Sequence, residues 1–279
     1  MRLYVEGVGL CGPGLEGWEE SAPVLAGERD YAPAPVRVPP AALLPANERR
    51  RAVQTVRLAL AVGAEAFAAA GRDPSGTATV FASSGGDGEN IHQILSVLAS
   101  SSREISPTRF HNSVHNTPAG YWSIATASRA ASSSLCAYDD SFAAGLLEAA
   151  VQASSARQAI GLIAYDVQYP APLGDVRSVG APFAVAFVFT PERTAAAFAG
   201  LDLDLRPGRD ASGFGPPPLE DLRRGTPAAR SLPLLAALAR REAASVALNY
   251  LDDMVLALDV APVRGDEAKL AARSGSAAP

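Results

Sequence analysis

Two spacings of apolar residues dominate the N-terminal part of the chain. Residues 1–8 (MRLYVEGV) alternate apolar with polar positions, and this period of two predicts a strand. Residues 46–71 repeat their apolar positions at helical intervals, which predicts one long helix with Asn47 as a candidate N-cap and Gly71 at its end. Between them, residues 9–45 are so rich in glycine and proline that we expect mostly loop.

The rest of the chain alternates short apolar runs with helical segments. Strands are expected at 77–83, 132–138, 159–165, 181–189, 200–205, 244–250 and 254–260, with 200–205 at a sheet edge. Helices are expected at 90–99, 117–127, 141–154 and 226–241, and a loop at 206–218. Segment 141–154 is apolar on nearly every side, so we expect it to be buried on every side. The alternation predicts a layered α/β sheet, although the long connection leaves the relative direction of 159–165 and 181–189 open.

Composition narrows the class of protein. The 279 residues are 48% hydrophobic, which is enough for one large domain or two small ones. A net charge of −5 argues against nucleic acid as a partner, because phosphate binding needs a basic surface. The two cysteines, Cys11 and Cys136, make no disulfide framework and favour a reducing, cytoplasmic location. The N-terminus lacks the features of a signal peptide, and no window holds the roughly 18 apolar residues of a membrane span.

None of the short motifs indicates independent catalysis. His111 and His115 stand four apart and could share a helix face as in zinc sites, but no convincing third ligand lies nearby, so a structural role is preferred. The loop SSGGDGEN (83–90) could hold an anion, but it lacks GxGxxG and the Walker Lys-Ser/Thr pair, which favours a simple turn. Residues 140–142 lack the GxSxG of a serine hydrolase. The basic run at 49–51 is either a docking patch for an acidic partner or, preferably, a solvated helix face.

One segment carries a resemblance to a known family. Residues 116–142, NTPAGYWSIATASRAASSSLCAYDDSF, resemble the β-ketoacyl synthase segment that runs from an asparagine and an Ala-Gly pair into the turn with the nucleophilic cysteine. Asn116 and Gly120 align with that segment without a gap. In the same register Asp139 falls on the nucleophile, and Cys136 lies three residues too early, inside the predicted strand.

A longer motif indicates a subfamily. The run HNSVHNTPAGYWSIAT (111–126), with His111, His115, Asn116 and Gly120, resembles short ketosynthase-like proteins of the chain-length-factor type, which occur in bacterial clusters for aryl polyene pigments. The resemblance implies an α/β, thiolase-like fold with one complete half, a layered αβα unit. It implies a ketosynthase N-terminal-like domain over 1–195 and a reduced C-terminal segment packed on it over 196–262. We expect a disordered tail at 263–279.

The residues that ketosynthases need for condensation are missing. In that family a cysteine thiolate holds the acyl chain, and two histidines and a lysine from the second half of the fold assist. Here the three histidines, His92, His111 and His115, all lie in the first half. The one lysine, Lys269, lies near the C-terminus. The resemblance therefore implies an inactive homologue rather than an enzyme.

An aspartate at the nucleophile position has two interpretations. An acyl-aspartate is an anhydride, too energy-rich to persist as an intermediate. We therefore expect Asp139, or equally Asp140, to cap the following helix, where free N–H groups stabilise a carboxylate. A decarboxylating or substrate-positioning role is the alternative.

The resemblance also implies partners. A full-length ketosynthase would form a heterodimer with this chain, and an acyl carrier protein is the further partner that it suggests; no cofactor and no metal are expected. Thiolase-fold proteins dimerise through the strand before the nucleophile turn, and this subunit would close the acyl tunnel of its partner. Candidates for the interface or tunnel wall are Ser133, Leu135, Tyr138, Phe142 and Leu146. The alternative is a stand-alone protein that binds acyl thioesters or decarboxylates malonyl groups.

Overall fold

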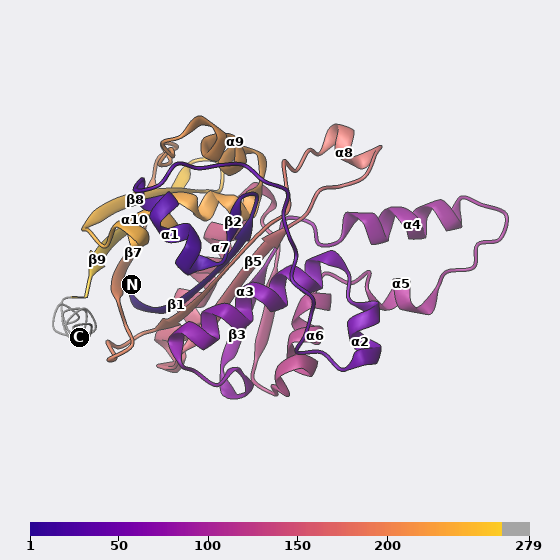
Figure 1. Cartoon of the computed structure of the whole chain (residues 1–279), viewed down its shortest axis with the longest axis horizontal. Coiled ribbons are helices and arrows are strands. Elements are labelled where there is room, and N and C mark those ends of the chain that lie inside the picture. Colours follow the sequence, from indigo (N-terminus) through magenta and orange to yellow (C-terminus); the bar gives the residue numbers. More distant parts are fainter. Residues whose placement is uncertain (264–279) are drawn as a thin grey trace, which may run out of the picture.

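A single mixed sheet with helices on both faces forms the body of the protein (Figure 1). The computed structural model describes residues 1–263, so the predicted tail lies outside the described residues except for Val263, and so does Lys269. The strands are β1 (Arg2–Gly12), β2 (Leu15–Glu16), β3 (Ala78–Ala82), β4 (Ser132–Leu135), β5 (Ile160–Asp166), β6 (Phe183–Thr190), β7 (Ala199–Pro207), β8 (Ala244–Tyr250) and β9 (Met254–Pro262). The helices are α1 (Trp18–Ala26), α2 (Ala46–Arg51), α3 (Gln54–Ala70), α4 (Gly88–Leu98), α5 (Pro107–His111), α6 (Thr117–Thr126), α7 (Ser141–Ala156), α8 (Leu173–Val176), α9 (Pro217–Gly225) and α10 (Leu232–Arg240), with 3-10 turns η1 (Pro74–Gly76), η2 (Tyr138–Asp140) and η3 (Pro227–Ser231).

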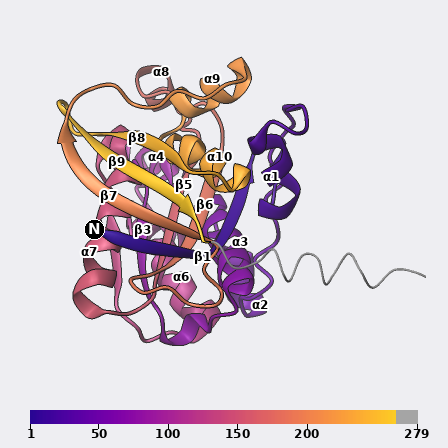
Figure 2. The ribbon, with the colours of Figure 1, turned by 90° about the vertical axis from the view of Figure 1, so that its left-hand side faces the viewer.

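The order of strands across the sheet is β4-β3-β5-β6-β1-β7-β9-β8, with β2 paired to the end of β1. Strands β4 and β5 run parallel to β3, whereas β6 is antiparallel to both β5 and β1. The direction that the sequence left open is thus antiparallel, because the connection between β5 and β6 leaves the sheet, forms α8 and returns. Strands β7, β9 and β8 continue the same sheet beyond β1 (Figure 2), so residues 196–262 extend the sheet of residues 1–195.

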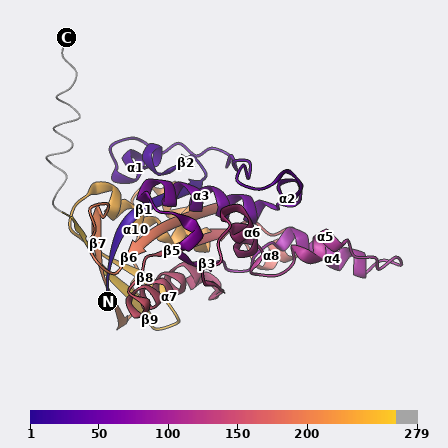
Figure 3. The same cartoon turned by 90° about the horizontal axis from the view of Figure 1, so that it is seen from below.

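Helices cover the two faces of the sheet as separate layers (Figure 3). On one face, α7, η3, α9 and α10 bury their apolar residues against β1, β3, β5 and β6. On the other face, α3 and α6 pack on the opposite side chains of the same strands, including Phe81 and Ile163. The layered αβα arrangement predicted from the resemblance is present. The exposed Val151 corrects the expectation that α7 is buried on every side, since this residue faces solvent.

The helix predicted over 46–71 is broken in two. Ala52 and Val53 are extended and separate α2 from α3, so Asn47 lies inside α2 and is not an N-cap. The amide of Asn112 donates to the carbonyl of Arg51 at 2.9 Å and so satisfies a group that the break leaves without a helical partner. Gly71 ends α3 in a left-handed conformation, as predicted.

Two other expectations need correction. The segment 9–45 contains helix α1, whose first N–H, at Trp18, is taken by the carboxylate of Glu65 on α3. Glu65 and Trp18 are far apart in the sequence, so the composition of 9–45, with its excess of glycine and proline, could not predict helix α1. Strand β7, expected at an edge, lies between β1 and β9, because the C-terminal hairpin β8–β9 pairs with its outer side.

Helix α3 lies unusually close to β1 because β1 carries glycines beneath it. A Cβ atom added to Gly7 would lie 2.0 Å from the carbonyl oxygen of Ala66, and one added to Gly9 would lie 2.0 Å from that of Val62. Glycine is therefore required at both positions for close approach, since neither has a positive φ. This contact places α3 against the centre of the sheet.

We predict that Gly9→Ala destabilises the fold by about 1–3 kcal/mol, because the new methyl group must push the α3 backbone away from β1. Gly200→Ala is the matched control, since a Cβ atom there meets nothing closer than 3.5 Å. Urea denaturation of both variants measures the difference. Equal midpoints for the two variants would contradict the close-packing account.

Candidate functional site

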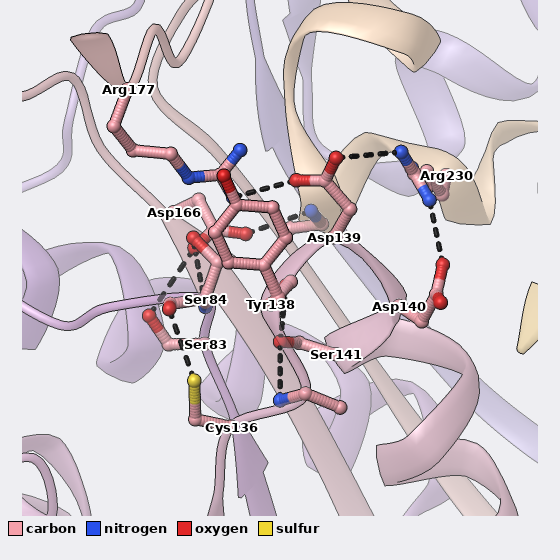
Figure 4. A network of polar contacts seen from close by, with 12 residues as sticks. Ser83, Ser84, Cys136, Tyr138, Asp139, Asp140, Ser141, Asp166, Arg177 and Arg230 are labelled. Atoms are coloured by element: carbon pink, nitrogen blue, oxygen red, sulfur yellow. Dashed lines mark hydrogen bonds and ion pairs between the residues drawn. The ribbon is translucent and has the colours of Figure 1, made fainter. Parts of the chain in front are cut away.

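The turn between β4 and α7 is closed by a serine. Ser141 accepts a hydrogen bond from the N–H of Ala137 at 3.0 Å and donates to the carbonyl of Tyr138 at 2.7 Å (Figure 4). Tyr138 has a φ of 52°, the strained left-handed region, and stands at the bend between strand and helix. Cys136 lies one residue after β4, and its thiol donates to the carbonyl of Ser84 at 3.0 Å. Cys136 is therefore not at the tip of the turn.

Two arginines hold the carboxylates of this turn. Asp139 forms ion pairs with Arg177 at 2.6 Å and with Arg230 at 3.1 Å, one through each carboxylate oxygen. Asp140 pairs with Arg230 at 2.7 Å. Arg177 follows α8 and Arg230 belongs to η3, so segments from both sides of the turn converge on it (Figure 4). The guanidinium of Arg177 also lies 3.8 Å from the centre of the Tyr138 ring, a cation–π contact.

These ion pairs overturn the expected capping role. Asp140 occupies the N-cap position of α7, but neither it nor Asp139 makes a side-chain bond to the first N–H groups of that helix. Burial raises the pKa of Asp140, and the positive charge of Arg230 opposes that rise. The carboxylates therefore bind cationic side chains from η3 and the α8 connection, which neither helix spacing nor local sequence could indicate.

A buried carboxylate beside this turn was missed from the sequence. Asp166 ends β5, is 2% exposed, and accepts hydrogen bonds from the N–H and hydroxyl of Ser84, the hydroxyl of Ser83 and the N–H of Ala228. Burial raises the pKa of Asp166 to about 6, and the hydrogen bonds act in the opposite direction. An acidic residue directly after the apolar run 159–165 was the available signal.

The glycine-rich loop after β3 is a structural turn. Its N–H groups are used inside the protein, since Ser84 N–H binds Asp166, Gly86 N–H binds the Ser83 hydroxyl and Asn90 N–H binds Asp87. Tyr169 lies over the loop so closely that a Cβ atom on Gly85 would be 2.1 Å from the tyrosine hydroxyl. These three donors of the loop are therefore taken by acceptors of this protein, which supports the interpretation as a turn.

The two histidines of the family motif lie apart. Helix α5 ends at His111, and His115 stands in the turn before α6, so the expected shared helix face does not exist. His111 contacts the ring of Tyr121 edge-on at 5.9 Å between centres, and Nε2 of His115 lies 3.1 Å from the carbonyl oxygen of Ser83. Within residues 1–263, no group of three His, Cys, Asp or Glu side chains is placed to hold a metal ion.

Seven residues of the motif 111–126, among them His111, Asn116 and Gly120, line an open apolar groove of about 430 Å³ at α5 and α6. Its lining residues are Pro107, Phe110, His111, Val114, Asn116, Thr117, Gly120, Tyr121 and Ile124. Phe110 is 66% exposed, Val114 52% and Ile124 47%, so three exposed large apolar side chains gather around this groove. The helices α4 and α5 next to the groove project from the body of the protein (Figures 1 and 3).

The sequence candidates for the interface or tunnel wall divide into two groups. Ser133 and Leu135 are half-buried on β4, and Tyr138 is 61% exposed after it. Phe142 and Leu146 lie in the interior on α7, where the ring of Phe142 packs against that of Phe187. These two side chains can support β4 from within but do not reach the surface.

The basic run on α2 is largely engaged within the protein. Arg49 donates to the carbonyls of Ala42 and Leu44, and Arg51 pairs with Glu48 at 3.6 Å. These contacts tie α2 to the preceding loop and agree with the preferred interpretation of a helix face.

Residues 18–211 match the family described as β-ketoacyl synthase, N-terminal domain. The chain belongs to this family. No curated protein sequence matches the chain significantly. Solved structures of ketosynthases do match. One is the ketosynthase ApeO in complex with its chain length factor ApeC from Xenorhabdus doucetiae, with 23% identity and a TM-score of 0.71 over 93% of this chain and 99% of the matched one.

Two further structures define the extent of the likeness. The ishigamide ketosynthase/chain length factor matches with 14% identity and a TM-score of 0.71 over 94% of this chain and 100% of the matched one. The ketosynthase from module 1 of the bacillaene synthase from Bacillus amyloliquefaciens FZB42 matches with 13% identity and a TM-score of 0.55, over 77% of this chain but 47% of that one. The likeness confirms the thiolase-like fold, and this family member is about as long as the first two matched chains. No described helix is long and apolar enough to cross a membrane.

We predict that Arg230→Met destabilises the protein by about 1–3 kcal/mol, because the half-buried carboxylate of Asp140 loses its partner. Arg206→Met is the control, since its pair with Asp204 is exposed and should contribute less than about 1 kcal/mol. Thermal and urea unfolding of the two variants provide the comparison. The arginine network would not hold the turn if both variants were as stable as the original protein.

Proposed function

We propose that this chain is a non-catalytic subunit of the chain-length-factor type, which binds a full-length ketosynthase and helps to shape its acyl tunnel. The observation that carries the proposal is the turn after β4. There, Asp139 is bound by two arginines at the position where the sequence register puts the ketosynthase cysteine. A carboxylate with both oxygens in ion pairs is a poor nucleophile, and no thiol stands at the bend to replace it.

The missing catalytic groups support the same proposal. Condensation needs donors that stabilise an enolate and an oxyanion, which ketosynthases supply with two histidines of their second half. In this chain the histidine nearest to the turn in sequence, His115, is directed to the carbonyl of Ser83. The segment after residue 195 supplies sheet strands and the covering helices α9 and α10, and it contains no histidine. An active partner would therefore have to supply the chemistry.

The open edge of the sheet at β4 supports the proposal that a partner binds there. Strand β4 pairs only with β3 among the described strands and stands at the end of the sheet. The carbonyls of Ala131 and Leu135 accept from N–H groups of Thr79 and Ser83. Because backbone groups alternate along a strand, those of Ser132 and Ser134 are directed to the open edge. A strand from a ketosynthase could pair there, and the small serine side chains would let the two backbones approach.

The groove at α5 and α6 supplies an apolar surface near this edge, since α6 packs beside β4. Phe110, Val114 and Ile124 expose large side chains around it. Exposed apolar patches of this kind mark interaction sites. We call the β4 edge together with this groove the ketosynthase-binding face. The matched structures from Xenorhabdus doucetiae and of the ishigamide system are of a ketosynthase with its chain length factor, which agrees with such a face in a chain of this length. An aryl polyene product is the context that the motif 111–126 suggests.

The alternative is a stand-alone protein that binds acyl thioesters or decarboxylates malonyl groups. It would need Asp139 or another polar group at the turn to meet the substrate, and the arginine pairs of Asp139 disfavour this. Co-expression with full-length ketosynthases from the same genome separates the two functions. A stable heterodimer, with no condensation or decarboxylation of malonyl carrier protein by this chain alone, is expected. A homodimer or monomer that decarboxylates malonyl thioesters would overturn the proposal.

We predict that Ser134→Pro weakens the heterodimer by about 10–100-fold, because proline removes an N–H from the open edge of β4 and so costs the interface about 1–3 kcal/mol. The fold should survive, since edge strands tolerate a proline whose N–H position faces outward. Ser132→Ala, which keeps the backbone donor, is the control. Analytical ultracentrifugation measures association, and full binding by a folded Ser134→Pro variant would exclude strand pairing.

We predict that the tunnel wall is formed by an exposed bulky side chain, so that Phe110→Ala in the reconstituted heterodimer lengthens the acyl products by at least one two-carbon unit. Tyr138→Ala tests the sequence candidate in the same way. Val151→Ala, on the outer face of α7, is the control and should leave product length unchanged. Mass spectrometry of the carrier-bound chains gives the answer, and unchanged lengths in both test variants would remove the wall role.

A further inference from the structure

Asp166 joins three segments that are distant in sequence. Its carboxylate lies at the end of β5 and is 2% exposed. One oxygen accepts from the N–H of Ser84 at 2.8 Å, from its hydroxyl at 2.7 Å and from the hydroxyl of Ser83 at 3.3 Å. The other oxygen accepts from the N–H of Ala228 in η3 at 2.8 Å. The carboxylate thus connects β5 with the loop after β3 and with the C-terminal segment (Figure 4).

Ser83 and Ser84 link Asp166 to two further segments of the protein. The carbonyl of Ser84 accepts the thiol of Cys136, which directly follows β4. The carbonyl of Ser83 lies 3.1 Å from Nε2 of His115, which stands in the turn between α5 and α6. Each serine therefore binds Asp166 on one side and a segment of the ketosynthase-binding face on the other. The N–H of Gly86 binds the Ser83 hydroxyl and keeps that side chain in place.

The four groups that contact Asp166 all donate hydrogen bonds to it. An ionised carboxylate can accept all four. The NH2 group of an amide would face the N–H of either Ser84 or Ala228, neither of which can accept, and the hydrogen of a protonated carboxyl would require a serine hydroxyl to turn and accept it. A buried donor without an acceptor is costly, so the arrangement depends on the ionised form. Replacing Asp166 with asparagine should therefore move Ser83 and Ser84, and with them Cys136 and His115.

We propose that Asp166 is a positioning residue for the ketosynthase-binding face, holding the end of β4 and the turn before α6 in register through Ser83 and Ser84. This inference rests on the proposed function. The carboxylate touches neither the open edge of β4 nor the groove, so it acts through the two serines. The same contact with Ala228 ties η3, and hence Arg230 of the turn network, to this arrangement.

A second buried carboxylate provides a matched control. Glu6 is 3% exposed on β1 and binds Arg72 and Thr194, and its hydrogen bonds and ion pairs within the described residues reach neither the loop after β3 nor β4 nor α6. Glu6→Gln should destabilise the protein as a buried polar change does, yet leave the ketosynthase-binding face alone. The comparison separates general loss of stability from loss of position.

The experiment compares Asp166→Asn, Asp166→Glu and Glu6→Gln in the full chain. Hydrogen exchange of the isolated protein is measured first. In Asp166→Asn we expect at least tenfold faster exchange at 83–88, 111–117 and 132–137, while Glu6→Gln leaves these segments unchanged. Association with the full-length ketosynthase identified by co-expression is then measured, with at least a tenfold weaker complex expected for Asp166→Asn and partial rescue by Asp166→Glu.

A pH profile supplies a readout that a merely structural role would not change. Because burial raises the pKa of Asp166 to about 6, wild-type association should weaken as the pH falls from 7 to 5 and the carboxylate takes up a proton. Asp166→Asn should lack this part of the profile. Tyr165 and Tyr169 adjoin Asp166 and stay neutral, since burial raises the pKa of both, and His115, Cys136 and Arg177 are present in both proteins.

The outcomes are distinguishable. If wild-type protein does not bind the ketosynthase, the proposed function fails, and the exchange data still test the role of Asp166. If wild type binds and Asp166→Asn binds equally well, or if Glu6→Gln weakens binding as much, the positioning role is wrong. Unchanged exchange at 111–117 and 132–137 in Asp166→Asn would also overturn it.

Discussion

The ion pairs of Asp139 with Arg177 and Arg230 are the interaction on which the structure of the turn after β4 depends. They occupy both oxygens of the carboxylate that the sequence register puts in place of the ketosynthase cysteine at the turn after β4. They also bring the α8 connection and η3 onto that turn, so a bend that would otherwise be free is enclosed by its own chain. Removing one partner of such a partly buried pair is costly, because the remaining charge is left without an opposite charge.

The C-terminal segment explains how a chain of this length remains well packed without a second complete half. Strands β7, β9 and β8 lengthen the first sheet beyond β1, and η3 and α10 bury nearly all their apolar residues in the same core as α7. Leu232, Leu234 and Leu235 on α10 are fully buried. The face of α7 that looks away from the sheet is thereby covered over part of its length, and Val151 marks where the cover ends.

The opposite end of the sheet is left open. Strand β4 has one neighbour among the described strands, and the groove at α5 and α6 exposes three large apolar side chains. The buried contacts of Asp166, Ser83 and Ser84 lie directly behind this surface and join it to the body of the protein. The turn holds arginine-bound carboxylates with no thiol at its bend, and apolar surface is available beside it, which supports the proposed subunit that acts through a partner.

By itself the sequence determined the element types, the layered α/β class and the family, because these follow from local periodicity and from a contiguous motif. The strands from 77–83 to 254–260 were placed within a few residues, and Gly71 was recognised as a helix end. The absence of histidines after His115 could also be seen in the sequence.

Tertiary structure alone decided what depends on contacts between distant residues: the break before α3, where Asn112 binds Arg51, and helix α1, whose start is held by Glu65. It likewise decided that Asp139 binds arginines instead of capping α7, and that Asp166 is the buried centre behind the turn. Each of these is a polar interaction across at least 35 residues, and no spacing rule reaches that far, because a side chain finds its partner only after the sheet has brought the segments together.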